Sequence, residues 1–564
     1  MSRLLKCLSV ATLLLLLTGQ GKLFAQQAVP GSADPGRIEK RFEQPALPKS
    51  VAEPVVPESP EQVPPEEAEK IKLTLSAVVI DGSTVYSEND LKPFYEDLLG
   101  KEISLADVYK IAEKITAKYG NDGYALSRAV VPAQRIREGI IKITIIEGFI
   151  DKVLIEGDAG GNADLIRAYA DKIVGVKPLT ANVLERYLLL ANDLPGASVK
   201  SVIRPSEANH GASTLVFVTE YKPVGATASI DNRGSRTSGP LEETFGVSGN
   251  ALLGMSEKSD LRFIRAGNNE LRYWTLSHQE MLGSEGTKLS LSANRSRSTP
   301  GYNLKNLEMR SRGFTGEIDL SHPFIRTRAS SLSVHAALAY KNTLSQQLHE
   351  TSSEDRLRVF KFGASYDYAD PWGGSNLLSA DLHKGLNVLS PTKRGRDLLS
   401  RSLGRSDFLK FTADYTRTQP LWDNFSLLAG VTGQKSAHNL LAGEEFGFGG
   451  SSFGRAYDSS EITGDSGIAA KLELQYTQSF PDWQIKYLQP YVFWDIGKVK
   501  QKTPLEAEKH SEAAASAGLG LRFGVTDYLS GSGEFSTPLT HDVAAKAPNA
   551  ARDTRFFFSM TANY

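Results

Sequence analysis

Alternation of apolar and polar residues dominates the chain from residue 222 to residue 564. In this region apolar side chains recur at every second position over segments of about ten residues. Such alternation predicts β-strands with one apolar face and one polar face. The apolar faces are formed by Leu332, Val334, Ala336, Leu338 and Tyr340; Phe360, Phe362, Ala364, Tyr366 and Tyr368; Leu409, Phe411, Ala413 and Tyr415; Ile468, Ala470, Leu472, Leu474 and Tyr476; and Ala517, Leu519, Leu521, Phe523 and Val525. No convincing amphipathic helix pattern follows Pro223.

Two classes of β-protein fit this alternation, a soluble β-rich module and a membrane barrel. The segments are about nine to eleven residues long, as a tilted strand needs to cross a bilayer. Aromatic residues often close the apolar face, as the girdles of membrane barrels require. The chain ends on an apolar strand formed by Phe556, Phe558, Met560, Ala562 and Tyr564. An unpaired apolar strand of this kind would promote aggregation in water, whereas its backbone groups are hydrogen-bonded when it closes a barrel. We therefore predict a transmembrane antiparallel barrel of about sixteen or seventeen strands.

Residues 71–149 and 150–221 carry a different pattern, in which strands and amphipathic helices alternate. In the first unit, Ser104 and Asp107 form a capping box that opens a helix. The apolar face of that helix comprises Val108, Ile111, Ala112, Ile115 and Tyr119. The plan recurs in the second unit, where Thr180 is expected to cap a helix. Two such α+β domains offer strand edges that can recruit an extended chain, although they could also serve as spacers.

The N-terminal region reads as a targeting segment followed by a linker. Residues 1–25 combine Arg3 and Lys6 with an apolar run too short to span a membrane, which predicts a secretory signal peptide. Residues 26–70 are rich in proline and glutamate and are expected to form an extended spacer. Within them, Gly36–Phe42 places two apolar side chains four residues apart. This segment is either a short docking helix or a solvated part of the linker.

Composition narrows the possible functions. The chain has 564 residues, a formal net charge of −1 and a mean hydropathy of −0.26. These values exclude a helical membrane protein with many spans, and they provide no global positive field to attract nucleic acid. They do not exclude a barrel, whose wall is apolar only at alternate positions. The one cysteine, Cys7, lies in the predicted signal peptide, so we expect no disulfide and no cysteine-based site in the mature chain.

One motif suggests an enzyme. Gly450–Gly454 matches the G-x-S-x-G pattern of a nucleophile elbow, but no helix pattern follows it, as that motif requires. The nine histidines are scattered, and no metalloprotease, phosphate-loop or dinucleotide-binding motif occurs. We therefore expect no catalytic residue, no cofactor and no metal.

A polar pair inside the predicted barrel is the stronger candidate. Arg455 lies in the glycine-rich segment Phe446–Tyr457, which we interpret as too flexible to form a strand. In the strand from residue 491 to 497, alternation directs Phe493 and Asp495 into the lumen. A loop folded into the lumen would bring Arg455 to Asp495 and bury the pair. An exposed loop arginine without that contact is the alternative.

These residues resemble a known family. Residues 453–457, Phe-Gly-Arg-Ala-Tyr, followed by Gly464-Asp465, resemble the sixth-loop motif of two-partner secretion transporters. Those are outer-membrane proteins of the haemolysin-activator type, a branch of the barrel-assembly superfamily. The family form is usually Val-Arg-Gly-Tyr, so Arg455 and Tyr457 match while the local turn departs from the pattern.

Further motifs extend the resemblance over the mature chain. The motif residues are Gly454, Arg455 and Tyr457 in the sixth loop; Phe493, Asp495 and Gly497 in the lumen partner motif; Asn232, Gly234 and Ser235 at the first barrel strand; and Phe558 and Tyr564 in the C-terminal strand signal. The implied architecture is mainly β, with a linker that holds a possible plug helix, two POTRA domains and a sixteen-stranded barrel at 222–564.

The resemblance also implies a function and partners. The expected function is an outer-membrane pore that secretes a large exoprotein of the adhesin or haemolysin type from periplasm to cell surface without ATP. The POTRA domains would capture the unfolded exoprotein, and the Arg455–Asp495 pair would hold the sixth loop in the lumen. Other expected partners are outer-membrane lipid and the barrel-assembly machinery. The alternatives are an assembly factor for other outer-membrane proteins and a soluble periplasmic β-rich binding protein.

Overall fold

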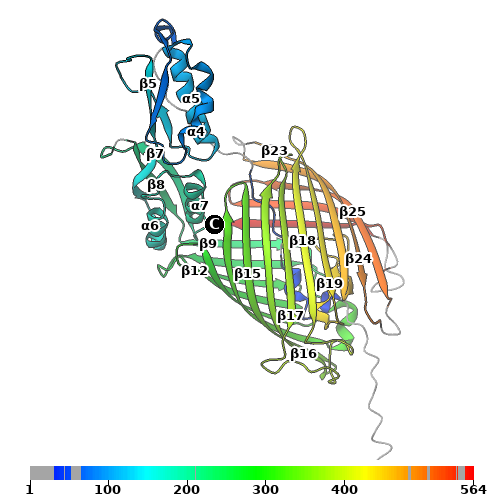
Figure 1. The fold of residues 1–564 in the computed structure, drawn as a ribbon. Helices are drawn as coiled ribbons and strands as arrows, with labels where there is room; N and C mark the ends of the chain where they lie inside the picture. The colour runs from blue at the N-terminus through cyan, green and yellow to red at the C-terminus, as the bar shows by residue number, and fades with distance from the viewer. Residues whose placement is uncertain are drawn as a thin grey trace, which may run out of the picture.

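The computed structural model describes residues 31–43, 45–51, 65–209, 211–480, 484–504, 509–540, 543 and 553–564. The predicted signal peptide and the proline-rich stretch 52–64 lie outside the described residues. Two small α+β units stand beside a closed β-barrel (Figure 1). Within the described residues, no helix combines the length and the apolar character needed to cross a membrane.

The first α+β unit packs its long helix on a three-stranded sheet. Its elements are β1 (Lys72–Thr74), β2 (Ala77–Asp81), α4 (Glu88–Leu91), η2 (Lys92–Phe94), η3 (Glu96–Leu98), β3 (Glu102–Ser104), α5 (Leu105–Asn121), β4 (Arg128–Val130) and β5 (Ile140–Ile146), preceded by α3 (Pro65–Ala68). Ser104 and Asp107 form the predicted capping box of α5. The predicted apolar face of α5 is buried against the sheet β2-β5-β4, so this part of the prediction is confirmed.

The second α+β unit repeats this arrangement. Its elements are β6 (Phe149–Gly157), η4 (Gly160–Asn162), α6 (Ala163–Asp171), α7 (Ala181–Asn192), β7 (Ala197–Pro205) and β8 (Ala212–Tyr221). Thr180 caps α7 by accepting a hydrogen bond from the Val183 amide, as predicted. In both units the first strand of the sheet pairs in parallel with the central strand, and the third pairs antiparallel with it. The second sheet leaves β7 at its edge, with most of the side chains of that strand exposed.

The remaining strands close into an antiparallel barrel of sixteen strands, which confirms the predicted fold class. They are β9 (Val224–Asp231), β10 (Glu242–Asn250), β11 (Lys258–Ala266), β12 (Leu271–Leu282), β13 (Thr287–Ser298), β14 (Arg310–Arg326), β15 (Ser330–Gln347), β16 (Glu350–Ala369), β17 (Ser375–Gly385), β18 (Leu409–Pro420), β19 (Phe425–Ser436), β22 (Ser466–Tyr476) with its continuation β23 (Gln478–Ser479), β24 (Tyr487–Lys500), β25 (Ser511–Gly524), β26 (Leu529–Pro538) and β27 (Arg555–Asn563). β27 pairs with β9, so closure leaves no unpaired strand edge in lipid.

The two faces of β24 meet opposite environments. On β24, Val492, Trp494 and Ile496 are 52%, 40% and 40% exposed, whereas Phe493 and Asp495 are 5% and 0% exposed. In this part of β24 the outer face is therefore apolar, and the lumen face holds the charged Asp495. A strand that crosses a bilayer requires this distribution.

The three longest strands greatly exceed the length that the alternation predicts. β14, β15 and β16 span 17, 18 and 20 residues, against the expected length of about nine to eleven. In β16 the outward apolar positions begin at Phe360, and the outward positions of residues 350–358 are polar. The alternation marks only the part of a strand that faces lipid, because the hydrogen-bonded ladder continues into water.

Ion pairs attach the second α+β unit to one end of the barrel. The guanidinium of Arg326, at the end of β14, donates two hydrogen bonds of 2.7 Å to the carboxylate of Asp193. The Lys172 ammonium lies 2.9 Å from a carboxylate oxygen of Glu285, in the β12–β13 turn, and this contact raises the pKa of Lys172. The long loops of the barrel lie at the opposite end (Figure 1).

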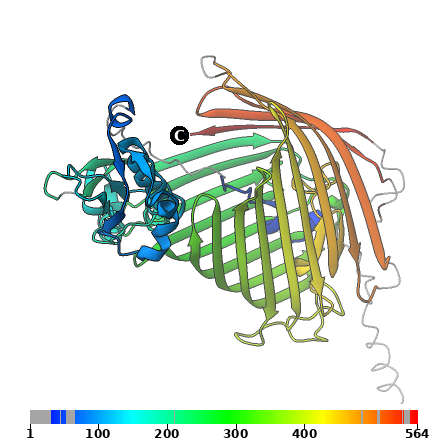
Figure 2. The same cartoon turned by 45° about the horizontal axis from the view of Figure 1, so that its top comes forward.

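The N-terminal segment lies inside the barrel, as the blue ribbon in Figure 2 shows. It contains η1 (Gly31–Ala33) and α2 (Ile38–Arg41). After α2 the chain passes toward the barrel end that carries the α+β units. There the amides of Lys49 and Ser50 donate hydrogen bonds of 2.7 and 3.1 Å to the carboxylate of Asp367.

Glu147 fixes the loop that follows β2. Its carboxylate accepts hydrogen bonds from the amides of Thr84 (2.6 Å) and Val85 (3.1 Å) and from the hydroxyl of Tyr119 (3.2 Å). Burial alone would raise the pKa of Glu147. The hydrogen bonds, those of Thr84 foremost, outweigh burial and hold the pKa below its ordinary value of 4.5.

We expect Glu147→Gln to destabilise the first unit by about 1.5–3 kcal/mol, because charge-assisted hydrogen bonds become neutral ones. A depressed folded pKa contributes stability above the unfolded pKa, and that stability is lost as pH falls through the folded pKa. The difference between the two proteins should therefore shrink below pH 4.5. Hydrogen exchange of the amides of residues 83–86 in the full chain measures this loss of stability. The control variant is Glu113→Gln, which changes an exposed glutamate on α5. Equal protection in both variants would contradict the prediction.

Candidate functional site in the barrel lumen

The loop between β19 and β22 folds into the barrel. It contains η6 (Ala442–Glu444) and a hairpin formed by β20 (Phe446–Phe448) and β21 (Ile462–Gly464). The prediction that Phe446–Tyr457 forms no strand is therefore wrong at β20. The two phenylalanines of β20 are buried against the barrel wall, and this packing orders a glycine-rich segment whose local sequence does not favour a strand.

Arg455 contacts Asp495 of β24 at the centre of this inward loop. The Arg455 Nε lies 3.1 Å from Asp495 Oδ2 and Nη2 lies 3.0 Å from Oδ1, which makes a bidentate pair. The backbone amides of Gly454 and Arg455 also donate to Oδ2, at 3.1 and 3.0 Å. Arg455 is 5% exposed and Asp495 is 0% exposed. The structure thus brings together the two residues that the sequence places on a loop and on a lumen strand.

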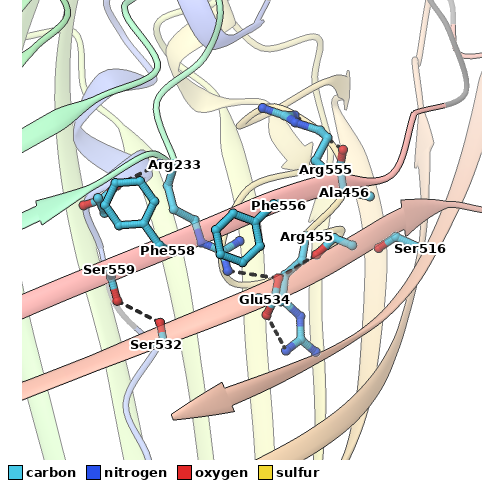
Figure 3. A network of polar contacts seen from close by, with 12 residues as sticks. Arg233, Arg455, Ala456, Ser516, Ser532, Glu534, Arg555, Phe556, Phe558 and Ser559 are labelled. Atoms are coloured by element: carbon cyan, nitrogen blue, oxygen red, sulfur yellow. Dashed lines mark hydrogen bonds and ion pairs between the residues drawn. The ribbon is translucent and has the colours of Figure 1, made fainter. Parts of the chain in front are cut away.

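Two glutamates that the sequence reasoning missed also face Arg455. Glu473 of β22 pairs with Nη1. An oxygen of Glu534 on β26 lies 3.7 Å from the same nitrogen, and Figure 3 shows Arg455 and Glu534 side by side. The centre of the guanidinium also lies 3.5 Å from the ring centroid of Phe493. The position of Glu473 in the lumen could have been predicted, because this residue lies on the polar face of a strand that the alternation predicts.

Other groups balance these carboxylates. Arg522 donates to Glu473 at 2.7 Å, and Arg233 donates to Glu534 at 2.9 Å. The hydroxyl of Tyr491 donates to Glu534 at 2.8 Å. Figure 3 shows Arg233 and Arg455 approaching Glu534 from different parts of the chain. The network therefore connects the inward loop with β22, β24, β25, β26 and the segment after β9.

Gly454 makes the turn that directs Arg455 toward Asp495. Its φ is +78°, in the left-handed region that favours glycine. A Cβ at this position would lie 2.7 Å from the ring of Phe448. The residue that requires a left-handed conformation thus precedes Arg455. Ala456, which follows Arg455, is buried and has no positive φ, so this position does not require glycine.

Tyr457 and Gly497 complete the two motifs. The Tyr457 Oη lies 2.9 Å from the carbonyl oxygen of Ala515 and 2.8 Å from that of Thr540, so it connects the inward loop to β25 and to the segment after β26. A Cβ on Gly497 would lie 2.2 Å from the ring of Phe448, so this glycine leaves room for the hairpin. Turns and bends follow Ser452, where a nucleophile elbow would continue into a helix.

Asp465 fixes the base of the inward loop. One of its oxygens accepts hydrogen bonds of 2.7 Å from the Arg401 guanidinium and from the Leu440 amide. The other accepts a hydrogen bond of 2.8 Å from the Lys502 amide. This residue, part of the Gly464-Asp465 pair in the sequence motif, joins three neighbouring loops at the end of the barrel that is remote from the α+β units.

Asn232 lies at the seam where the barrel closes. Its side-chain amide donates to the Phe556 carbonyl at 2.9 Å, and its Oδ1 accepts from the Phe558 amide at 2.7 Å. It thereby extends the β9–β27 pairing. At the end of that seam, the amide of Tyr564 donates to the Ala226 carbonyl at 2.8 Å, while its side chain is 84% exposed.

The other first-strand residues contact the N-terminal segment indirectly. A Cβ on Gly234 would lie 1.9 Å from the carbonyl oxygen of Gly239, so only glycine fits this turn. The buried hydroxyl of Ser235 hydrogen-bonds that of Ser238. Ser238 in turn accepts a hydrogen bond of 2.8 Å from Arg41 of α2.

Two buried ion pairs hold α2 in the lumen. Arg37 pairs with Glu445 of the inward loop, and Arg41 pairs with Glu242 of β10. All four side chains are at most 7% exposed. α2 is therefore attached both to the inward loop and to the barrel wall.

Apolar packing adds to these pairs. Ile38 is buried against β11 and β12, and Phe42 stacks on Tyr273 with ring centroids 5.0 Å apart. Ile38 and Phe42 thus share the face that their spacing predicts, and the interpretation as a docking helix fits better than a solvated linker. Between α2, the inward loop and β9–β11, the lumen keeps a cavity of about 970 Å³.

Family models match the two parts of the chain described above. The family described as haemolysin secretion/activation protein ShlB/FhaC/HecB matches residues 211–523, which is more than half of the chain. The POTRA domain of the ShlB type matches residues 73–148, which contain the first α+β unit.

Individual relatives are similar over most of the chain. The heme/hemopexin transporter protein HuxB of Haemophilus influenzae is 21% identical over 542 residues, which cover 94% of each chain. The outer membrane transporter CdiB of Escherichia coli O6:K15:H31 is 24% identical over 497 residues, covering 83% of this chain and 79% of the relative. A solved structure of CdiB from Escherichia coli has a TM-score of 0.72 at 20% identity and covers 90% of this chain and 93% of that one. The chain belongs to the ShlB/FhaC/HecB family of two-partner secretion transporters of the outer membrane.

Proposed function

We propose that this protein secretes a large partner exoprotein through the lumen of its barrel, from the periplasm to the cell surface. The observation that carries the proposal is that charged contacts hold the two elements filling the lumen. α2 is held by the pairs Arg37–Glu445 and Arg41–Glu242, and the inward loop is held by Arg455. Water in an opened pore can solvate the charged groups of α2, so this short segment can leave the lumen while Arg455 keeps the inward loop attached to the wall.

The motif residues take distinct roles in this proposal. Arg455, with Gly454 and Tyr457, anchors the inward loop, and Asp495, Phe493 and Gly497 receive it. Asn232, Gly234 and Ser235 shape the start of the barrel next to α2, and Phe558 and Tyr564 form the closing strand. α2 acts as a plug that leaves the lumen when the exoprotein enters, and folding of the exoprotein outside the cell gives direction without ATP.

The proposed domain limits are those that the sequence predicts. The limits are 1–25 for the signal peptide, 26–70 for the linker, 71–149 and 150–221 for the POTRA domains and 222–564 for the barrel. β6 begins at Phe149, which supports a boundary one residue earlier between the two POTRA domains.

The edge strand β7 is the proposed capture site for the exoprotein. Its side chains are mostly exposed, and Val202 and Ile203 are 43% and 37% exposed. An unfolded chain with high β-propensity can add to such an edge through backbone hydrogen bonds, and exposed apolar side chains strengthen the contact.

We expect Val202→Lys to lower secretion about fivefold, because a charge on an edge strand disfavours pairing by ~1 kcal/mol. Quantifying the exoprotein in the culture supernatant measures this. Ile71→Lys is the matched control, since Ile71 is 50% exposed and lies outside the sheet strands. Equal secretion by the two variants would place capture elsewhere.

The proposal is tested against an assembly factor by deleting the gene and comparing culture supernatants and outer membranes. We expect the loss of one large exoprotein from the supernatant, its return on complementation, and unchanged porin levels. Lower porin levels with no specific loss from the supernatant would favour the assembly factor instead.

A further inference from the structure

Outward-facing arginines gather at one end of the barrel wall, on β12 to β14. Arg295 and Arg297 of β13 have the parity of Leu291, which is 40% exposed on the outer face. Arg310 and Arg312 of β14 have the parity of Phe314, which is 44% exposed. These arginines therefore lie on the outside of the barrel, and all four are exposed.

The register places like charges directly opposite one another. Arg297 pairs with Arg272 on one side and with Arg312 on the other. Opposed like charges destabilise a sheet. Arg295, Arg297, Arg310 and Arg312 make no ion pair with any of the described residues. An anion bound across the row would remove this repulsion.

A groove lies beside this row. It has a volume of about 880 Å³ and is lined by Arg295, Arg312, Arg356 and Arg358, with Glu354 as the one acidic residue among those that line it. Phe314 and Tyr340 provide an apolar floor. The guanidinium of Arg358 lies 3.5 Å from the ring centroid of Tyr340, which fixes its position. The groove thus combines a cationic rim with an apolar surface.

The height of the row relative to the membrane follows from β14. Its far end, Arg326, binds Asp193 of the second POTRA domain and so lies on the periplasmic side. A rise of ~3.3 Å per residue gives roughly 45 Å along the strand from Arg326 to Arg312, or roughly 35 Å across the membrane at a tilt of ~40°. That distance places the arginines at the headgroup level of the outer leaflet. The aromatic residues Trp274, Phe314 and Tyr340 lie next to the row, as an interface girdle does.

We propose that this surface, the outer arginine row of β12–β14 with the groove over Phe314 and Tyr340, binds a phosphorylated glycolipid of the outer leaflet. The phosphates contact the unpaired arginines, whose planar groups suit bidentate binding. The acyl chains lie along the apolar floor and the wall below it. The inference rests on the outer-membrane location alone and does not depend on secretion.

Binding by the purified full-length protein tests the proposal. The probes are diphosphorylated lipid A, the same lipid without its phosphates, and inorganic phosphate, each titrated in detergent. We expect wild type to bind diphosphorylated lipid A at least about tenfold more tightly than Arg297→Gln/Arg312→Gln does. Lys498→Gln/Lys500→Gln removes the same charge from exposed positions on β24 and should behave as wild type.

Three outcomes would overturn the proposal: equal affinity in the double arginine variant, equal affinity for the dephosphorylated lipid, or displacement of lipid A by inorganic phosphate at the same concentration. The last would identify a free-anion site. Heat-modifiable gel mobility confirms that each variant is folded. If the arginine variant fails to fold, the affinities of the wild-type protein for phosphorylated and dephosphorylated lipid A still test whether the phosphates are recognised.

Discussion

Arg455→Ala should lower secretion at least about tenfold while leaving the barrel folded in the outer membrane. The substitution leaves the buried carboxylates of Asp495, Glu473 and Glu534 without their shared cation. Removing one partner of a buried pair costs ~3–5 kcal/mol, and ~3 kcal/mol shifts a docked loop toward undocking more than about a hundredfold. Exoprotein in the supernatant, normalised to heat-modifiable barrel in the membrane, gives the measurement.

Matched variants separate the role of the Arg455 pair from a general effect of charge. Arg262→Ala removes an arginine that points into the lumen from β11 and is exposed there, and it should secrete normally. Arg455→Lys should retain only part of the activity, because an ammonium cannot bind Asp495 through a planar fork. Adding Asp495→Asn to Arg455→Ala should restore some secretion, since one uncompensated charge is removed. Normal secretion by Arg455→Ala alone would end the proposed role of this residue.

Arg37→Ala/Arg41→Ala should open the pore. α2 is four residues long, too short to be stable as a helix without its contacts, and the double variant removes both ion pairs that hold it. At ~3–5 kcal/mol for each broken pair, the lumen-bound state should become the minor one. Single-channel recordings in planar bilayers should show a larger mean conductance, and cells should take up large antibiotics more readily.

Lys49→Ala is the control for the plug variant. It removes a positive charge from the same segment, but the Lys49 side chain is exposed and only its backbone amide contacts Asp367. Its conductance should match that of wild type. An unchanged conductance in Arg37→Ala/Arg41→Ala would show that apolar packing of Ile38 and Phe42 suffices to keep α2 in place.

Local patterns predicted much of this fold. Period-two alternation is a direct consequence of strand geometry, so the barrel wall and the inward direction of Asp495 could be predicted. The capping box at Ser104 and the cap at Thr180 likewise depend on a few adjacent residues. Each of these features is determined within one turn of a helix or one strand.

Features that depend on distant segments could not be predicted in this way. Glu534 joins the Arg455 network only because β26 lies near β24 across the barrel curve. Strand β20 forms because Phe446 and Phe448 pack on the barrel wall, not because of its own glycine-rich sequence. The arginine row could not be predicted either, because it depends on the strand register that places Arg297 opposite Arg272 and Arg312.

The central claim is that the partner exoprotein passes through this lumen, and site-specific photo-crosslinking of a stalled exoprotein tests it most directly. Thr244 and Phe245 are neighbours on β10; Thr244 lines the lumen cavity, and Phe245 is 52% exposed on the outer face. With a photo-reactive residue at each position in turn, we predict an adduct with the exoprotein at Thr244 and none at Phe245. No adduct at Thr244, or equal adducts at both positions, would contradict transport through the barrel.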